Sequence, residues 1–373
     1  MPDHARAVAV AEEDLLGDPA PLPVIHYAEQ ALLGALLLVP DRLKTISPLE
    51  PEHFASAAHS SLFAAMRTVS PPTPEVHRSS PVWPNQLLEA AQTRALTAAY
   101  LHILISNCPT DAHAPAYAQM VRSGHARRLL RRHAGLLSQA ARTPGPDPAG
   151  TVLARADRLA AYLDELATAF PSHPGSMPRT PAAPSPAVEA STEAEDEERM
   201  LLAAATARPD DLPRMRWLHE SDFTVPVHAA LFACLTALAR IGAPVDPITL
   251  LWEAQQRGLL HAKFGPDEVL DLVSHPAGAP EYWGQKILQR ALLSQAVTVA
   301  ARIATLTSDE ATSVHQLATG SRRALSALSS VRTRWHHATD DPGGKPPSRP
   351  SAALRTPAVR AGPAARTPAR PGR

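Results

Sequence analysis

Apolar residues recur along this chain mostly at spacings of three and four, which is the pattern of amphipathic helices. The first such segment predicts a helix from Glu29 to Val39, and Pro40-Asp41 ends it. Gly34 or Ala35 allows a neighbouring helix to approach closely. A second helix is expected near Ala57, with an inward face made by Leu62, Phe63 and Met66.

Each half of the chain ends in a predicted helical hairpin. The first has arms at 117–141 and 151–170, joined by a loop rich in proline and glycine. Its second arm carries a heptad seam with alternating steps of four and three: Val152, Ala156, Leu159, Leu163, Leu166 and Phe170. The second hairpin has one apolar arm with Leu288, Leu292, Val299, Ile303 and Leu306, and another with Val314, Leu317, Leu325, Leu328 and Val331.

One phrase occurs twice at a constant offset. It starts at Glu29 and again at Glu198, and it continues without gaps through Phe63 and Phe232. Self-similarity of this length indicates a duplicated domain. His59 and His228 occupy equivalent positions in the two copies.

The copies differ further on. Asp246 is an N-terminal helix cap before Pro247, and Gly258 should end that helix. The first copy has Trp83-Pro84 at this place, so the capping carboxylate is gone.

These patterns predict an all-α protein of two domains, each a small helical bundle with a hairpin. β-branched and aromatic alternation is scarce, so little sheet is expected. A linker rich in proline should separate the domains, and the basic end rich in proline and arginine should be disordered. The expected division is 1–24, flexible start; 25–170, first domain; 171–194, linker; 195–335, second domain; 336–373, tail.

Charge, cysteines and hydropathy narrow the class of protein. Lys plus Arg equals Asp plus Glu at 36 each, so net charge points to no partner. Cys108 and Cys234 lie in no metal-binding spacing, and Cys234 is expected to be a small buried apolar residue. The start has no signal-peptide pattern, and the longest apolar run, 31–39, is too short to span a bilayer. A soluble, cytoplasmic protein is expected.

The segment from Glu29 to Asp41 resembles the opening of the N-terminal domain of DnaB-type replicative helicases. The Phe54…His59…Leu62-Phe63 continuation fits as well, and so does the segment from Tyr117 to Arg122 that enters the hairpin. In the second copy, Val245 to Leu251 followed by Arg257-Gly258 also matches. The resemblance covers about 26–170 and 195–335.

The resemblance implies an all-helical domain with a protruding hairpin. In that family the hairpins pair domains into dimers, three dimers form the helicase collar, and the collar contacts primase. The departure from the family is large, because a second such domain stands where the helicase has its RecA-type ATPase domain. The 373 residues contain no G-x-x-x-x-G-K-[ST] loop to hold nucleotide phosphates, so helicase activity is not expected.

No catalytic, cofactor or metal site is predicted. The 17 histidines include no HExxH, and no nucleophile–base or paired-carboxylate arrangement has supporting context. For His59 and His228 the favoured interpretation is structural, an imidazole that satisfies a local backbone group near the start of a helix. A functional role for this pair is the alternative.

The sharpest charged feature lies on the first hairpin arm. Its arginines are either a solvated face or a docking patch for an acidic partner or phosphate, for which the acidic segment 193–198 is one candidate. The candidate interaction residues are Arg122, Arg127, Arg128, Arg131 and Arg132, together with the seam residues Leu159, Leu163, Leu166, Leu288 and Leu292.

The favoured function is a non-catalytic replication protein that contacts the helicase or primase, or self-associates through its hairpins. The two hairpins of one chain are expected to pack on each other. The rival is a DNA-binding accessory protein that uses the arginines and the basic tail, with weak, sequence-independent contacts. An enzyme with an unrecognised site and a helicase relic without function are further alternatives.

Overall fold

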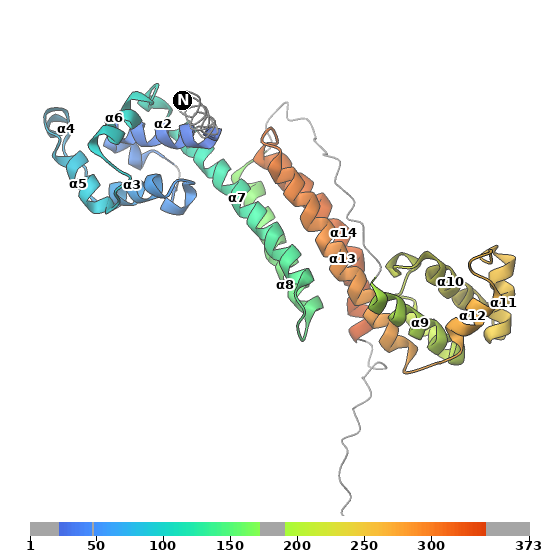
Figure 1. Cartoon of the computed structure of the whole chain (residues 1–373). Coiled ribbons are helices and arrows are strands. Elements are labelled where there is room, and N and C mark those ends of the chain that lie inside the picture. Colours follow the sequence, from blue (N-terminus) through green and yellow to red (C-terminus); the bar gives the residue numbers. More distant parts are fainter. Residues whose placement is uncertain (1–21, 47, 172–190, 341–373) are drawn as a thin grey trace, which may run out of the picture.

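The computed structural model describes residues 22–46, 48–171 and 191–340. The described residues form helices and no strand, apart from one isolated bridge between His261 and Phe264. Most of the predicted start 1–24, most of the predicted linker 171–194 and nearly all of the predicted tail lie outside the described residues. Helices begin at Val24 and at Thr192, so the predicted start and linker are each too long at their C-terminal end. Two globular heads lie at opposite ends of a central pair of hairpins (Figure 1).

The first globular head, head 1, is built on α2 (Val24–Leu38), which begins five residues before the predicted start at Glu29. Gly34 is needed here because an added Cβ would lie 2.1 Å from the backbone oxygen of Leu104 on α6. The other helices of this head are α3 (Ala57–Thr68), α4 (Pro74–Ser79), α5 (Val82–Ala91) and α6 (Ala98–Ser106), with short 3-10 segments η1 (Pro40–Lys44), η2 (Pro51–His53) and η3 (Asp111–His113).

The second globular head, head 2, repeats this arrangement with α9 (Thr192–Ala207), η4 (Pro209–Met215), η5 (Glu220–Asp222), α10 (Pro226–Arg240), α11 (Pro247–Gln256) and α12 (Pro266–Val273). The predicted cap of α11 is confirmed, because Asp246 Oδ1 accepts hydrogen bonds from the backbone N–H groups of Ile248 and Thr249. Gly258 follows the helix at φ +69°, the left-handed conformation that favours glycine. In head 1, α5 has no side-chain cap, as predicted.

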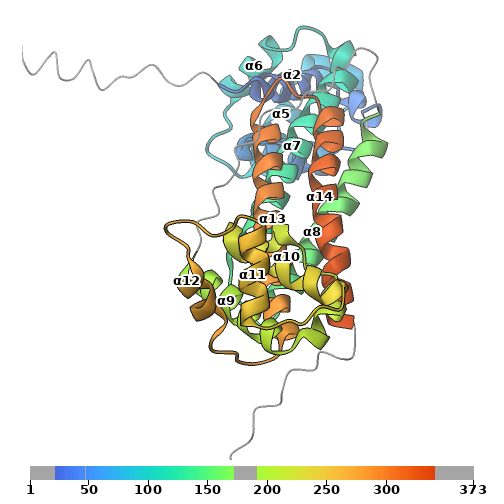
Figure 2. The same cartoon turned by 90° about the vertical axis from the view of Figure 1, so that its right-hand side faces the viewer.

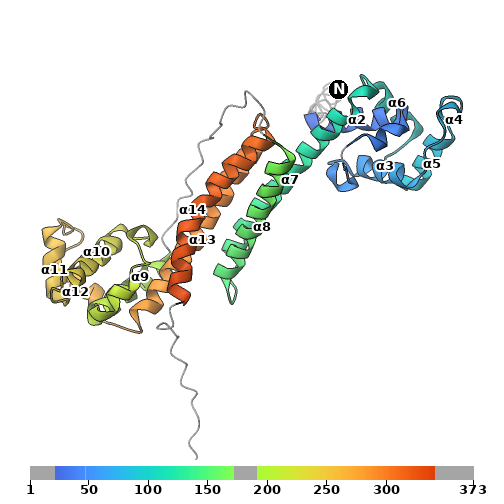
Figure 3. The same ribbon diagram turned by 180° about the vertical axis from the view of Figure 1, so that it is seen from behind.

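The hairpins are α7 (Ala114–Arg142) with α8 (Pro148–Ala169), and α13 (Pro280–Ser308) with α14 (Val314–Asp340). They lie side by side in antiparallel fashion, α7 against α13 and α8 against α14, so that the tip of each hairpin lies beside the base of the other (Figures 1 and 3). The expected packing of the two hairpins within one chain is therefore confirmed. One continuous apolar core joins them to head 2.

Helix α14 extends five residues beyond the predicted boundary at 335. Trp335 packs against the core, Ala338 is buried, and Gln285 Nε2 donates to the Ala338 carbonyl at 2.7 Å. On the same helix, Arg332 and Arg334 pair with Asp157 and Asp222. The prediction of disorder from residue 336 is thus wrong for 336–340, because tertiary contacts hold this last turn.

Helix α13 is the one helix among the described residues that is long and apolar enough to cross a membrane by length and composition. It packs against α7, α9 and α14 at the centre of the bundle (Figure 2). The core helix of a bundle passes the same test, so its apolar composition follows from its position.

Candidate functional site

The arginines of α7 lie at the contact between the two hairpins. Arg127 donates from one guanidinium nitrogen to the carbonyls of Thr307 and Asp309, at 3.1 and 2.7 Å, and from the other to Thr312. Arg131 donates to the same Thr307 carbonyl at 2.7 Å. These carbonyls lie at the C-terminal end of α13 and in the loop that follows it, where a positive charge is favourable.

Arg127 and Arg131 therefore form a cap that one hairpin supplies to the other. Burial, followed by the nearby charge of Arg131, lowers the pKa of Arg127 from its ordinary value. The carbonyl oxygens offset this desolvation with charge-assisted hydrogen bonds. The interpretation as a solvated face is wrong for Arg127, and the acidic segment is not its partner. Two acidic residues of that segment are engaged elsewhere, Glu197 with Arg290 and Glu198 in the buried interior of head 2.

We expect Arg127→Ala to lower the free energy of unfolding by about 1–3 kcal/mol, because it removes several charge-assisted hydrogen bonds to partly buried carbonyls. The measurement is chemical denaturation followed by circular dichroism. Arg132→Ala is the matched control, since Arg132 is exposed on the same helix. Equal effects of the two substitutions would contradict the role of Arg127 as a cap.

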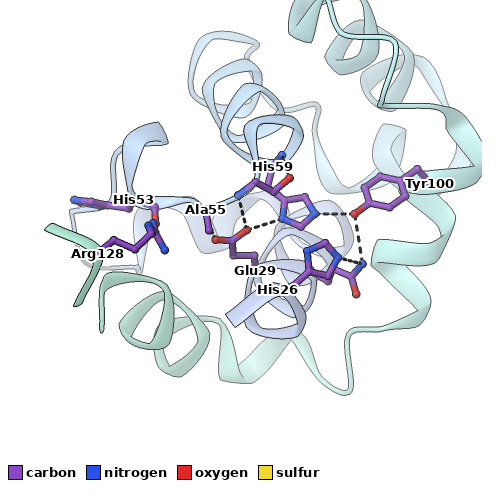
Figure 4. A network of polar contacts seen from close by, with 9 residues as sticks. His26, Glu29, His53, Ala55, His59, Tyr100 and Arg128 are labelled. Carbon is purple, nitrogen blue, oxygen red and sulfur yellow. Dashed lines mark hydrogen bonds and ion pairs between the residues drawn. The ribbon is translucent and has the colours of Figure 1, made fainter. Parts of the chain in front are cut away.

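The other candidate arginines serve head 1 and its own hairpin. Arg128 donates to the His53 carbonyl at 2.7 Å, which ties α7 to the turn η2 (Figure 4). Arg122 lies 5.7 Å from the centre of the Phe170 ring, in cation–π distance. Of the five arginines, at least three are thus committed to contacts between helices of this chain.

The five candidate leucines are all in the shared core, whereas Phe170, the last residue of the predicted heptad seam, is only partly buried against it. The exposed fraction is 0% for Leu159, Leu163, Leu288 and Leu292, and 4% for Leu166. Polar contacts flank this core: Arg322 donates to the Leu163 carbonyl at 3.2 Å and pairs with Asp164. The leucines are therefore interaction residues between the two hairpins of one chain, and they are buried from any other partner.

A buried polar network lies inside head 1 and is centred on Glu29 and His59, whose side chains are fully buried (Figure 4). The carboxylate accepts from the backbone N–H groups of Ala55 and Ser56, at 2.5 and 3.3 Å, and from His59 Nδ1 at 2.7 Å. The other ring nitrogen of His59 lies 2.7 Å from the Tyr100 hydroxyl. Glu29 thus fixes the turn before α3 to the middle of α2.

Head 2 repeats the centre of this network. Glu198 accepts from the N–H groups of Thr224 and Val225, at 2.6 and 3.2 Å, and from His228 Nδ1 at 2.9 Å. A hollow of about 520 Å³ borders His228. The structural interpretation of both histidines agrees with these contacts, although their partner is a glutamate rather than a backbone group.

Sequence reasoning did not assign a role to Glu29 or Glu198. The available signal was that each glutamate begins the repeated phrase and lies 30 residues before the equivalent histidine. An acidic residue conserved between two copies within an apolar helix face is a sign of a buried, hydrogen-bonded carboxylate.

A second pair of histidines joins the turn η2 to α7. The rings of His53 and His125 are 4.5 Å apart, and His125 Nδ1 donates to the Glu52 carbonyl at 3.1 Å. Burial, and then the charge of the neighbouring ring, lowers the pKa of His53; burial, and then Arg128, lowers the pKa of His125. The folded state therefore favours the neutral rings.

A lowered pKa in the folded state predicts stability that is present above the ordinary histidine value of about 6.5 and lost as pH falls below it. We expect the free energy of unfolding to decrease between pH 7 and pH 5, and His125→Gln to make this decrease shallower. Chemical denaturation of both proteins across this range is the measurement. Parallel pH profiles would contradict the assignment.

Among residues 22–46, 48–171 and 191–340 no group of three or more His, Cys, Asp or Glu side chains is arranged to hold a metal ion. Cys234 is buried, as predicted, and burial raises the pKa of its thiol to about 11. This is the environment of an unreactive core cysteine.

The fold and its contacts define an all-helical protein in which two like heads are joined through one shared hairpin bundle. Comparison with protein-family models finds the DnaB-like helicase N terminal domain at residues 22–123 and again at 190–283. These matches cover more than half of the chain, and the chain belongs to this family. Each match covers one head and the start of its hairpin. Neither the comparison with curated proteins nor that with solved structures found a match.

Proposed function

We propose that this protein is a non-catalytic, cytoplasmic component of DNA replication that acts by binding other proteins. The observation that carries the proposal is the pairing of α7–α8 with α13–α14 inside one chain. The family resemblance implies that hairpins pair two domains of separate chains in the helicase collar. Here a single chain supplies both partners of such a pair.

Intramolecular pairing leaves the two heads as the surfaces for partners. The leucine seams are buried and Arg127 and Arg131 are engaged with α13, so neither set is free to recruit a protein. The heads differ at their surfaces. On α11 of head 2, Ile248 and Trp252 are 65% and 62% exposed. Different surfaces on the same fold support different partners for the two heads.

The replicative helicase and primase are the proposed partners, because the resemblance places contacts to both on this domain. The test is affinity capture of the tagged full chain from native cells, followed by light scattering with the purified helicase and primase of the same organism. A complex of defined mass with either protein is the expected result. A chain that captures neither protein and changes the mass of neither would overturn the proposal.

The rival proposal is DNA binding. Its support from the hairpin arm is reduced, because Arg127, Arg128 and Arg131 donate to backbone carbonyls of this chain. The basic segment 341–373 lies outside the described residues, and the rival proposal now rests on this segment. Removing 341–373, rather than 336–373, preserves the last turn of α14. Loss of DNA retention at low salt with helicase binding intact would favour this rival as an additional activity.

A further inference from the structure

Both heads have a groove at the same place, between the 3-10 segment after the first helix and the second long helix. In head 2 its apolar lining includes Leu212, Met215, Leu218 and Phe232. The equivalent positions of head 1 are Leu43, Ile46, Leu49 and Phe63, and they line the equivalent groove. The two grooves enclose about 900 Å³ in head 2 and about 470 Å³ in head 1.

The difference in size has a local cause. In head 1 an ion pair between Arg67 of α3 and Glu50 crosses the groove, and Arg67 also reaches the Leu49 carbonyl at 3.5 Å. Thr236 and His219 stand at the equivalent positions of head 2, and both line the open groove. A threonine is too short and carries no charge, so this bridge cannot form. Duplication has produced a smaller, bridged groove in head 1 and a larger, unbridged groove in head 2.

The chemistry of the open groove selects its ligand. Its floor is apolar, and two exposed arginines, Arg216 and Arg240, line its edge together with one exposed glutamate, Glu220. A segment with large apolar side chains next to acidic ones would bury the former on the floor and pair the latter with the arginines.

Three segments of this chain lie outside the described structure, and they differ in charge. Residues 172–190 hold one basic and one acidic residue, Arg179 and Glu189, and 341–373 is strongly basic. Residues 1–21 are acidic, and Glu12-Glu13-Asp14 directly precedes Leu15-Leu16. This is the one segment of the three that complements the groove. We propose that the groove of head 2 binds residues 12–16 of a second copy of this chain.

The occupant must come from a second copy, because residues 12–16 cannot reach the groove in head 2 of their own chain. Residues 12–16 are joined to head 1 at Leu22 through five residues, so that Leu16 and Leu22 are at most about 22 Å apart. The groove lies in the opposite head, beyond hairpin helices of 29 residues that are about 44 Å long (Figure 1). A chain therefore cannot place its own residues 12–16 in its own head 2. Binding between copies joins head 1 of one chain to head 2 of the next, and it does not depend on helicase or primase.

The test is sedimentation velocity of the full chain over a range of concentrations. The key variant, His219→Glu with Thr236→Arg, introduces the ion pair of head 1 into head 2 and narrows the groove with residues that the same fold already accommodates. We expect it to weaken self-association by at least about tenfold, which corresponds to about 1.4 kcal/mol. Glu12→Gln with Glu13→Gln and Asp14→Asn should weaken it as well, and a peptide of residues 1–21 should compete.

The matched control is Glu50→His with Arg67→Thr, which opens the groove of head 1 and should leave the existing association in place. Thermal melting of each variant verifies that it is folded. A full chain that stays monomeric at all concentrations would overturn the proposal, as would association that the groove-narrowing variant leaves unchanged. If narrowing the groove weakens association but neutralising residues 12–14 does not, another segment is the occupant and this assignment is wrong.

Discussion

Replacing Glu198 by alanine is expected to be the most damaging single substitution in head 2, lowering the free energy of unfolding by about 3–5 kcal/mol. The side chain is fully buried and accepts three hydrogen bonds, from two consecutive backbone N–H groups and from His228. Alanine removes the acceptor of all three donors, and each buried group left unsatisfied costs about 1–3 kcal/mol. Chemical denaturation followed by circular dichroism measures the change.

Two comparisons make this prediction specific. Glu29→Ala should have an effect of similar size in head 1, because Glu29 makes the equivalent three contacts. Glu220→Ala should change the free energy of unfolding by less than about 0.5 kcal/mol, since Glu220 is exposed. A Glu198→Ala protein as stable as the Glu220→Ala control would show that the network does not stabilise the fold.

Leu163→Ala and Leu292→Ala are each expected to cost about 2–5 kcal/mol of folding stability. Both side chains are fully buried in the core that the two hairpins share. Each truncation removes apolar contact area and leaves a cavity between helices that are held on several sides. The same denaturation experiment measures the loss, with partner binding assayed on the folded fraction.

This prediction separates a core residue from a docking residue. A leucine that contacts an external partner would lose binding on truncation while the isolated chain kept its stability. Ile241→Ala is the matched control, because Ile241 is 73% exposed and its truncation should change stability by less than about 0.5 kcal/mol. Leucine variants that retain full stability but lose a partner would contradict the assignment to the core.

Local sequence pattern was sufficient for the helices and for several of their ends. The heptad seam from Val152 to Leu166 is buried as the spacing predicts, and Asp246 caps α11. These features depend on residues within a turn or two of one another. The repeated phrase, which indicates duplication, was sufficient to predict an arrangement of two like domains.

Contacts between residues far apart in the chain could not be predicted from local sequence pattern. Arg127 lies about 180 positions from the carbonyls that it caps, and no local feature of α7 distinguishes it from Arg132. The composition of the last turn of α14 predicts a disordered tail, but Trp335 and Ala338 pack this turn against the core. Such pairings are set by the antiparallel arrangement of the hairpins, which charge and periodicity within one helix do not encode.

The central claim is that the two hairpins of one chain pair with each other, and a spin-label distance measurement tests it most directly. Labels would replace Asp157 on α8 and Arg332 on α14, an ion pair between the hairpins, after Cys108 and Cys234 are changed to alanine. The labelled chain is mixed with a large excess of unlabelled chain, so that only distances within one molecule contribute. The account predicts a short distance, as between helices whose axes lie about 10 Å apart, that persists on this dilution. Loss of the short distance on dilution, or its absence, would contradict it.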